Sequence, residues 1–262
     1  MKILLVSDIH ANIHALRAIE QAETWDEIWC CGDLVDFGPD PVDVIRWMQA
    51  HNARVVLGNH DAHVLSLTQE DCRRAWDDRT WQWAHQNFEQ LGDGDFAYLR
   101  GLPKMLRLSA DGISYQMQHQ YDGSYGTVES LDQFGRFWQG ESVPLRRMLF
   151  GHTHRRCMHL LDEHTCWINP GSVSYRRPDD PDKRAHYMMI EDGCAHFGSV
   201  AYDRSALLAR TREIHRAGRM LPTNLQDAYF FFGSAATTRD PLPEKDDIQP
   251  GGEPYDASER HR

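Results

Sequence analysis

KILLVSDIHAN, residues 2–12, is an apolar run that ends in a carboxylate and an imidazole. Its four consecutive apolar residues, Ile3 to Val6, predict a strand that is buried on both faces. Asp8 and His10 are two positions apart, so their side chains lie on the same side of an extended backbone, at the strand end where α/β sheets place ligands. This pairing of oxygen and nitrogen predicts a site for Mn, Fe, Zn or Ni. The alternative is that Asp8 caps the next helix and His10 packs under a loop.

Length and charge narrow the classes of function. A chain of 262 residues can bury the core of one large domain or of two small ones. The formal net charge of -11 disfavours duplex nucleic acid as a partner, because that binding depends mainly on neutralising phosphates. A small phosphate ester is still compatible with this charge, since bound metal ions can outweigh it locally.

Targeting and membrane signals are not visible in the sequence. The chain opens on a strand, and no apolar run approaches the roughly 18 residues of a membrane span. None of the six cysteines has C-x-x-C spacing, which argues against a zinc ribbon or a thioredoxin motif. We therefore expect a cytoplasmic protein with reduced thiols and no membrane partner.

Polar clusters also follow the other predicted strands. Residues 28–31 lead into Gly32-Asp33, and residues 54–57 lead into Gly58-Asn59-His60-Asp61. Amphipathic helical patterns separate these first strands, and this alternation predicts a parallel sheet with helices on both faces. Further along, a predicted hairpin of residues 105–117 ends at His119, and a strand at 148–150 ends in the sequence GHTH, residues 151–154.

Residues 71–90 form a predicted helical segment that is rich in aromatic residues, among them Trp76, Trp81, Trp83 and Phe88. One interpretation is that these rings pack the segment onto the body of the protein. The alternative is a lid whose rings stack on a nucleobase. Gly92-Asp93-Gly94 is expected to end the helix.

In chain order the polar strand ends spell D-x-H, G-D, G-N-H-D, H and G-H-x-H. This string resembles that of the calcineurin-like metallophosphoesterases, in their small bacterial and archaeal phosphodiesterase branch, over about residues 1–200. The sequences at 33–39 and 169–172 and the Leu221-Pro222 pair add to the likeness. The resemblance implies a four-layer α/β sandwich of two mixed β-sheets, face to face and flanked by helices. The expected domain is 1–235, with a helical lid or cap at 71–100. Residues 236–262, rich in Pro, Gly and charge, are expected to form a disordered acidic tail.

The resemblance also implies a ligand set for two divalent ions. Asp33 would bridge the ions, which need a shared anion when they lie about 3.5–4 Å apart. The first ion would be held by Asp8, His10 and His154, and the second by Asn59, His119 and His152.

The implied reaction is hydrolysis of a phosphate ester by a hydroxide that bridges the two ions. His60, which is not a ligand in this family, would stabilise or protonate the leaving oxygen, and Asp61 could orient it. Arg177 would hold a substrate phosphate as a bidentate fork. Two positions depart from the family pattern: Ala11 and Gln120 stand where relatives usually have Gly.

Three functions are compatible with this motif set. The first is a phosphodiesterase for a nucleotide-like or other small phosphate ester. The second is a dinucleoside polyphosphate hydrolase or a phosphomonoesterase that uses the same site. The third is a non-catalytic scaffold of the same fold, which is disfavoured because every ligand position and His60 carry competent residues. A Ser-His-Asp hydrolase is disfavoured because no G-x-S-x-G motif is present.

Overall fold

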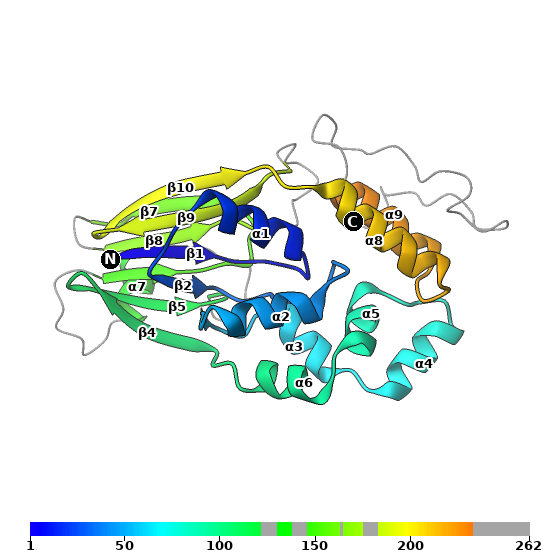
Figure 1. The fold of residues 1–262 in the computed structure, drawn as a ribbon. Coiled ribbons are helices and arrows are strands. Elements are labelled where there is room, and N and C mark those ends of the chain that lie inside the picture. Colours follow the sequence, from blue (N-terminus) through cyan, green and yellow to red (C-terminus); the bar gives the residue numbers. More distant parts are fainter. Residues whose placement is uncertain (122–129, 138–145, 163–164, 175–182, 233–262) are drawn as a thin grey trace.

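Two five-stranded mixed sheets, packed face to face, form the centre of the protein (Figure 1). The structure is a computed structural model that describes residues 1–121, 130–137, 146–162, 165–174 and 183–232. The expected acidic tail, 236–262, and Arg177 therefore lie outside the described residues.

The first sheet has the strand order β10-β9-β1-β2-β3. Strands β1 to β3 are parallel, whereas β9 pairs antiparallel with both β1 and β10. The bounds are β1 (Lys2–Val6), β2 (Glu27–Cys30), β3 (Arg54–Val55), β9 (Ala185–Glu191) and β10 (Cys194–Val200).

The second sheet has the order β4-β5-β6-β8-β7. Its central strands β5, β6 and β8 are parallel, and its two edge strands are antiparallel to their neighbours. The bounds are β4 (Met105–Ala110), β5 (Ile113–Gln118), β6 (Arg146–Leu149), β7 (Arg156–Leu160) and β8 (Thr165–Pro170).

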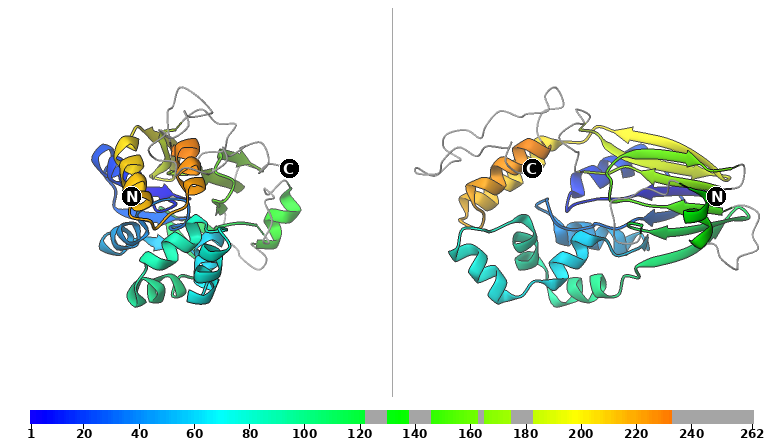
Figure 2. Two further views of the ribbon diagram at one scale, coloured as in Figure 1. Left: turned by 90° about the vertical axis from the view of Figure 1, so that its right-hand side faces the viewer. Right: turned by 180° about the vertical axis from the view of Figure 1, so that it is seen from behind.

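Helices cover the outer faces of the sheet pair, and Figure 2 shows them on opposite sides of it. Those on the first sheet include α1 and α2, and α7 covers the second sheet. The described helices are α1 (Ile13–Ala22), α2 (Pro41–Ala50), α3 (Asn59–Ser66), α4 (Gln69–Asp77), α5 (Trp83–Gln90), α6 (Asp93–Arg100), α7 (Leu131–Phe137), α8 (Arg204–Arg216) and α9 (Pro222–Phe232).

Strand β1 is buried on both faces, as its apolar run predicts. Leu4 and Val6 pack against the helical layer, while Ile3 and Leu5 pack between the two sheets. The expected sandwich of two mixed sheets is confirmed. The expectation that helices cover both faces of the first sheet is wrong, because its inner face packs on the second sheet through residues such as Trp29 and Tyr115.

The aromatic segment contains two helices, α4 and α5, followed by α6, rather than one helix that ends at Gly92. Gly92 is instead the N-cap of α6, where its N–H donates to Asp95 Oδ2 at 2.9 Å. Trp83 is buried in a cluster with residues of α8 and α9, and Trp81 is buried in a cluster with Leu221, which precedes α9. This burial supports the packing interpretation for these two rings.

No described helix has the length and apolar character that a membrane crossing requires. All six cysteines lie in described segments, and none of them forms a disulfide.

Candidate metal centre

Loops from both sheets meet at one end of the sandwich. The segments that follow β1, β2 and β3 supply Asp8 and His10, then Asp33, then Asn59 and His60. Strands β5 and β6 of the second sheet lead into the loops that supply the remaining three imidazoles: His119, His152 and His154. The seven expected ligands thus come from five loops and from both sheets.

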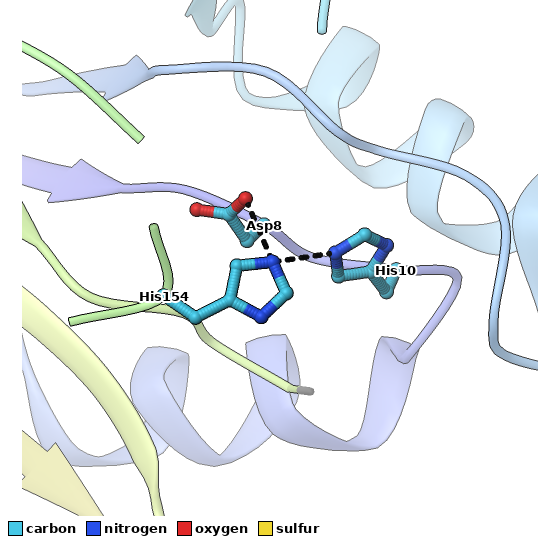
Figure 3. Close-up of side chains that lie close together, drawn as sticks. All are labelled: Asp8, His10 and His154. Atoms are coloured by element: carbon cyan, nitrogen blue, oxygen red, sulfur yellow. Dashed lines mark hydrogen bonds and ion pairs between the residues drawn. The ribbon is translucent and has the colours of Figure 1, made fainter. Parts of the chain in front are cut away.

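The first cluster consists of Asp8, His10 and His154, whose ligand atoms all lie within 4.8 Å of one another (Figure 3). His154 Nε2 is 3.2 Å from Asp8 Oδ1 and 3.3 Å from His10 Nε2. All three side chains are buried.

The second cluster consists of Asp33, His119 and His152, again with ligand atoms within 4.8 Å. His119 Nε2 is 3.1 Å from Asp33 Oδ2. Asn59 belongs to this group as well, because its Oδ1 lies 2.9 Å from His119 Nε2 and 2.8 Å from His152 Nδ1.

Electron pairs converge in the second cluster in a way that fits a cation. The Nδ1 of His119 lies 2.7 Å from the carbonyl oxygen of Cys31, which can only accept, so Nδ1 carries the proton. The Nε2 lone pair then faces the oxygens of Asp33 and Asn59, and Asp33 Oδ2 is buried with no hydrogen-bond partner among the described residues. Lone pairs that face one another repel, and either an extra proton or a metal ion between them removes this repulsion. Carboxylate, amide and imidazole donors suit a divalent transition metal.

Charge around the clusters favours the protonation states that bind metal. Burial alone would raise the pKa of Asp8, but the neighbouring His154 outweighs it and lowers that pKa to about 2. Burial lowers the pKa of His10 to about 3 and that of His152 to about 4, with help from nearby imidazoles. An ionised carboxylate and neutral imidazoles are the forms that ligate a metal. For His119, burial is outweighed by Asp33, which raises the pKa to about 9, so a metal would displace a proton there.

The backbone at the site is held in a costly conformation. The φ angles of Asp8, His10, Asp33, His152 and His154 are +55°, +48°, +57°, +67° and +57°, all in the left-handed region. For residues other than Gly this region costs of order 1–3 kcal/mol each, and such outliers concentrate at functional sites. Positive φ at five candidate ligands is therefore an independent indication that this is the functional end of the sandwich.

Two motif glycines allow the loops to approach this closely. A Cβ on Gly58 would lie 2.0 Å from Asp33 Oδ1, and one on Gly151 would lie 1.9 Å from Ser7 Oγ. Both distances are far inside van der Waals contact. The glycines of the G-N-H-D and G-H-x-H motifs are thus required by the packing of the loops around the two acids.

His60 lies beside the clusters and is oriented by Asp36. Its Nδ1 is 2.8 Å from Asp36 Oδ2, its N–H donates to Asp33 Oδ1 at 2.9 Å, and its ring centroid is 5.0 Å from that of His10. Burial lowers the pKa of His60, but the bond to Asp36 and the charges of Asp33 and Asp36 outweigh it and raise the pKa to about 9. The raised pKa favours the protonated form of this imidazole, which is the form that can act as an acid.

The expectation that Asp61 orients His60 is wrong. The buried Asp61 carboxylate instead accepts four backbone N–H groups, those of Asp33, Leu34, Val35 and Gly58, at 2.8–3.1 Å. Asp61 thus ties the loop after β2 to the loop after β3 and positions Asp33 through the main chain.

Asp36 is the site residue that sequence reasoning missed. Its position three residues after Asp33, in a loop at a strand end, is the signal that could have identified it. The 169–172 turn has a supporting role that was also not foreseen. Asn169 Nδ2 donates to the carbonyl of Gly151 at 2.6 Å, and Ser172 Oγ donates to the carbonyl of Asp8 at 2.9 Å.

A comparison with protein families agrees with this geometry. The family model of the calcineurin-like phosphoesterase superfamily domain matches residues 1–192. The chain belongs to this superfamily.

Curated relatives match a short part of the chain. Curated proteins named symmetrical bis(5'-nucleosyl)-tetraphosphatase are 40% identical in Edwardsiella ictaluri and 41% identical in Photorhabdus laumondii, over 73 residues. The match spans 26% of this chain and about a quarter of the length of those relatives (26% in each).

Two solved structures share the fold over most of the chain. A metallophosphoesterase from Sphaerobacter thermophilus is 24% identical, with a TM-score of 0.67, and covers 87% of this chain and 98% of its own. A hypothetical protein from Pyrococcus horikoshii is 15% identical, with a TM-score of 0.69, over 89% of this chain and 98% of its own.

Proposed function

We propose that this protein is a phosphoesterase that uses two divalent metal ions, with a phosphodiesterase acting on a nucleotide-like or other small ester as the first assignment. The observation that carries the proposal is the pair of clusters at one sheet end, with the imidazole of His60 held beside them by Asp36. A non-catalytic scaffold has no need of strained ligands or of an acid held by Asp36.

Each residue of the chain has a defined part in this proposal. Asp8, His10 and His154 would hold one ion, and Asn59, His119 and His152 the other, with Asp33 shared between them. Such ions supply positive charge for phosphate oxygens and a hydroxide nucleophile near neutral pH.

His60 would donate a proton to the leaving oxygen, since Asp36 binds its Nδ1 and leaves Nε2 to carry the acidic proton. Asp61 would act only through the backbone of the Asp33 loop. Arg177 stays a proposed phosphate-binding residue on sequence resemblance alone.

A dinucleoside polyphosphate hydrolase is the second candidate. The 73-residue match to the tetraphosphatases at 40% identity favours it. We propose this substrate class as the alternative to a simple diester, because both place one phosphorus atom between two oxygen substituents at the same site.

The metal, compartment and partners complete the proposal. Carboxylate, amide and imidazole donors suit Mn, Fe, Zn or Ni, and manganese is the first ion to test. We propose a small phosphate ester as the partner, with no duplex nucleic acid and no membrane surface, and a cytoplasmic location that agrees with six unpaired cysteines.

The test is turnover of bis-p-nitrophenyl phosphate and of diadenosine tetraphosphate by protein loaded with Mn, Ni, Fe or Zn, with metal content measured on the same sample. We expect two ions per chain and cleavage of at least one substrate. Protein that holds two ions and cleaves neither substrate, nor any of a panel of mono-, di- and cyclic phosphates, would contradict the proposal.

A further inference from the structure

A cavity of about 400 Å³ opens beside the second cluster, and its walls include Asn59 and His119. This volume is within the range of small-molecule sites, which is about 300–1,000 Å³. Two residues, Asn59 and His119, belong both to the cavity lining and to the candidate metal centre, so a ligand bound at the centre can extend directly into the cavity.

Lys104 supplies the charge of this cavity. It is the one Lys or Arg among the nine described residues of the lining, which include no Asp or Glu, in a protein whose net charge is -11. Its ammonium forms no hydrogen bond or ion pair within the described residues. An exposed, unpaired cation in a wall without carboxylates is suited to an anion.

The β4–β5 hairpin brings Lys104 and His119 to the same cavity. Met105 pairs with Gln118 at the open end of the β4–β5 hairpin, so the next opposed positions are Lys104 and His119. The backbone before Lys104 is fixed as well, because Leu57 N–H donates to the carbonyl of Pro103 at 2.8 Å.

Gln120 adds a polar group to the same wall. Its Oε1 is buried and has no hydrogen-bond partner in the described part of the chain. The two ends of a carboxamide can exchange places by rotation, so Gln120 can present an N–H donor to an anion.

We propose that this cavity binds the phosphate group next to the one attacked at the metal centre, with Lys104 as the specificity-determining residue. The inference rests on the proposed phosphoesterase and deepens it by placing its second substrate candidate ahead of the first. It assigns the preferred substrate class as compounds with two or more linked phosphates, over a diester of a single phosphate.

The decisive measurement is binding rather than turnover. Calorimetric titration of the metal-loaded protein with inorganic pyrophosphate and with inorganic phosphate should give at least tenfold tighter binding of pyrophosphate. Lys104→Met should lose about 10- to 100-fold in pyrophosphate affinity, as expected for one charged hydrogen bond, and less than twofold in phosphate affinity. Lys104→Arg should retain most of the preference.

Lys2→Met is the matched control, since Lys2 lies at the opposite end of β1 and pairs with Glu23 at 3.7 Å. It should change neither affinity. The inference is overturned if Lys104→Met leaves pyrophosphate binding unchanged or weakens phosphate binding equally.

Kinetics separate this result from the proposed function. If the protein is active and Lys104→Met lowers kcat/KM equally for diadenosine tetraphosphate and bis-p-nitrophenyl phosphate, the role of Lys104 is rejected and the phosphoesterase function is kept. The same holds if the substitution lowers kcat/KM for neither substrate. If the protein cleaves no substrate but still prefers pyrophosphate through Lys104, the phosphoesterase function is rejected and the role of Lys104 is kept.

Discussion

The two ligand clusters use similar side chains but differ in how they meet the surroundings. The ligands in both clusters are almost fully buried, with exposed fractions of 0%, 0% and 8% for Asp8, His10 and His154, and of 0%, 3% and 9% for Asp33, His119 and His152. The second cluster adds the amide of Asn59 and lies against the cavity that also contains Lys104. Because the cavity adjoins the second cluster, we call it the open cluster and the first the enclosed cluster, and we expect the open cluster to exchange its ion faster and to meet substrate.

Asp33 joins the two clusters energetically. Its oxygen lies 3.1 Å from His119 in the open cluster, and its charge also raises the pKa of His10 in the enclosed one, against the larger effect of burial. Substitution of Asp33 should therefore affect metal binding at both clusters, whereas substitution of a single imidazole should affect metal binding at one cluster alone.

Asp33→Asn should have the largest effect. An amide removes the shared negative charge, so we expect both ions to be lost and turnover to disappear. Elemental analysis after gel filtration measures this directly. Retention of two tightly bound ions would show that Asp33 is not the shared ligand.

His10→Ala and His119→Ala should each remove one ion, and from different clusters. Wild-type protein exposed to a chelator should lose its ions in two phases, the faster from the open cluster. His119→Ala should abolish the fast phase and His10→Ala the slow one, as followed by metal release over time. A single phase of metal release in the wild type would show that the two clusters do not differ in how fast they release an ion.

His60→Ala should retain both ions and lose activity. General acid catalysis contributes about 10²- to 10⁴-fold, so kcat should fall by that factor while metal content stays at the wild-type value. Loss of metal in this variant would instead make His60 part of the ligand set.

Asp36→Asn should have the smallest effect, about 10- to 100-fold in kcat, as is usual for a residue that orients a site group. Asp36 helps to raise the pKa of His60, and an acid works only below its pKa. Without this carboxylate the alkaline decline in kcat should begin at a lower pH. An unmoved pH profile at wild-type metal content would show that His60 is not the titrating acid.

The place of the expected ligands at strand ends could be predicted from the sequence, whereas their assignment as ligands came from the resemblance to a family. Burial of the run fixes the strand, and the strand end fixes where Asp8, Asp33 and His152 lie. The pairing of His60 with Asp36 could not be read this way. It depends on the loop at Asp36 and Phe37, whose φ angles of +72° and +63° bring Asp36 within reach of His60.

The sheet packing shows a second limit of sequence patterns. Alternating strands and helices indicate that β1 to β3 are buried, but apolar residues such as Trp29 and Val56 do not reveal whether a helix or a sheet covers them. The resemblance to a family supplied that information. The roles of Arg177 and of the 71–100 segment remain predictions.

Because the candidate ligands come from both sheets, bound ions would act as cross-links between the two halves of the sandwich. Asp8, His10, Asp33 and Asn59 follow strands of one sheet, and the other three imidazoles follow strands of the second. A ligand present at 1,000 times its Kd adds about 4 kcal/mol to the stability of the state that binds it. Metal supply would then set how firmly the sheets are joined as well as whether the site is active.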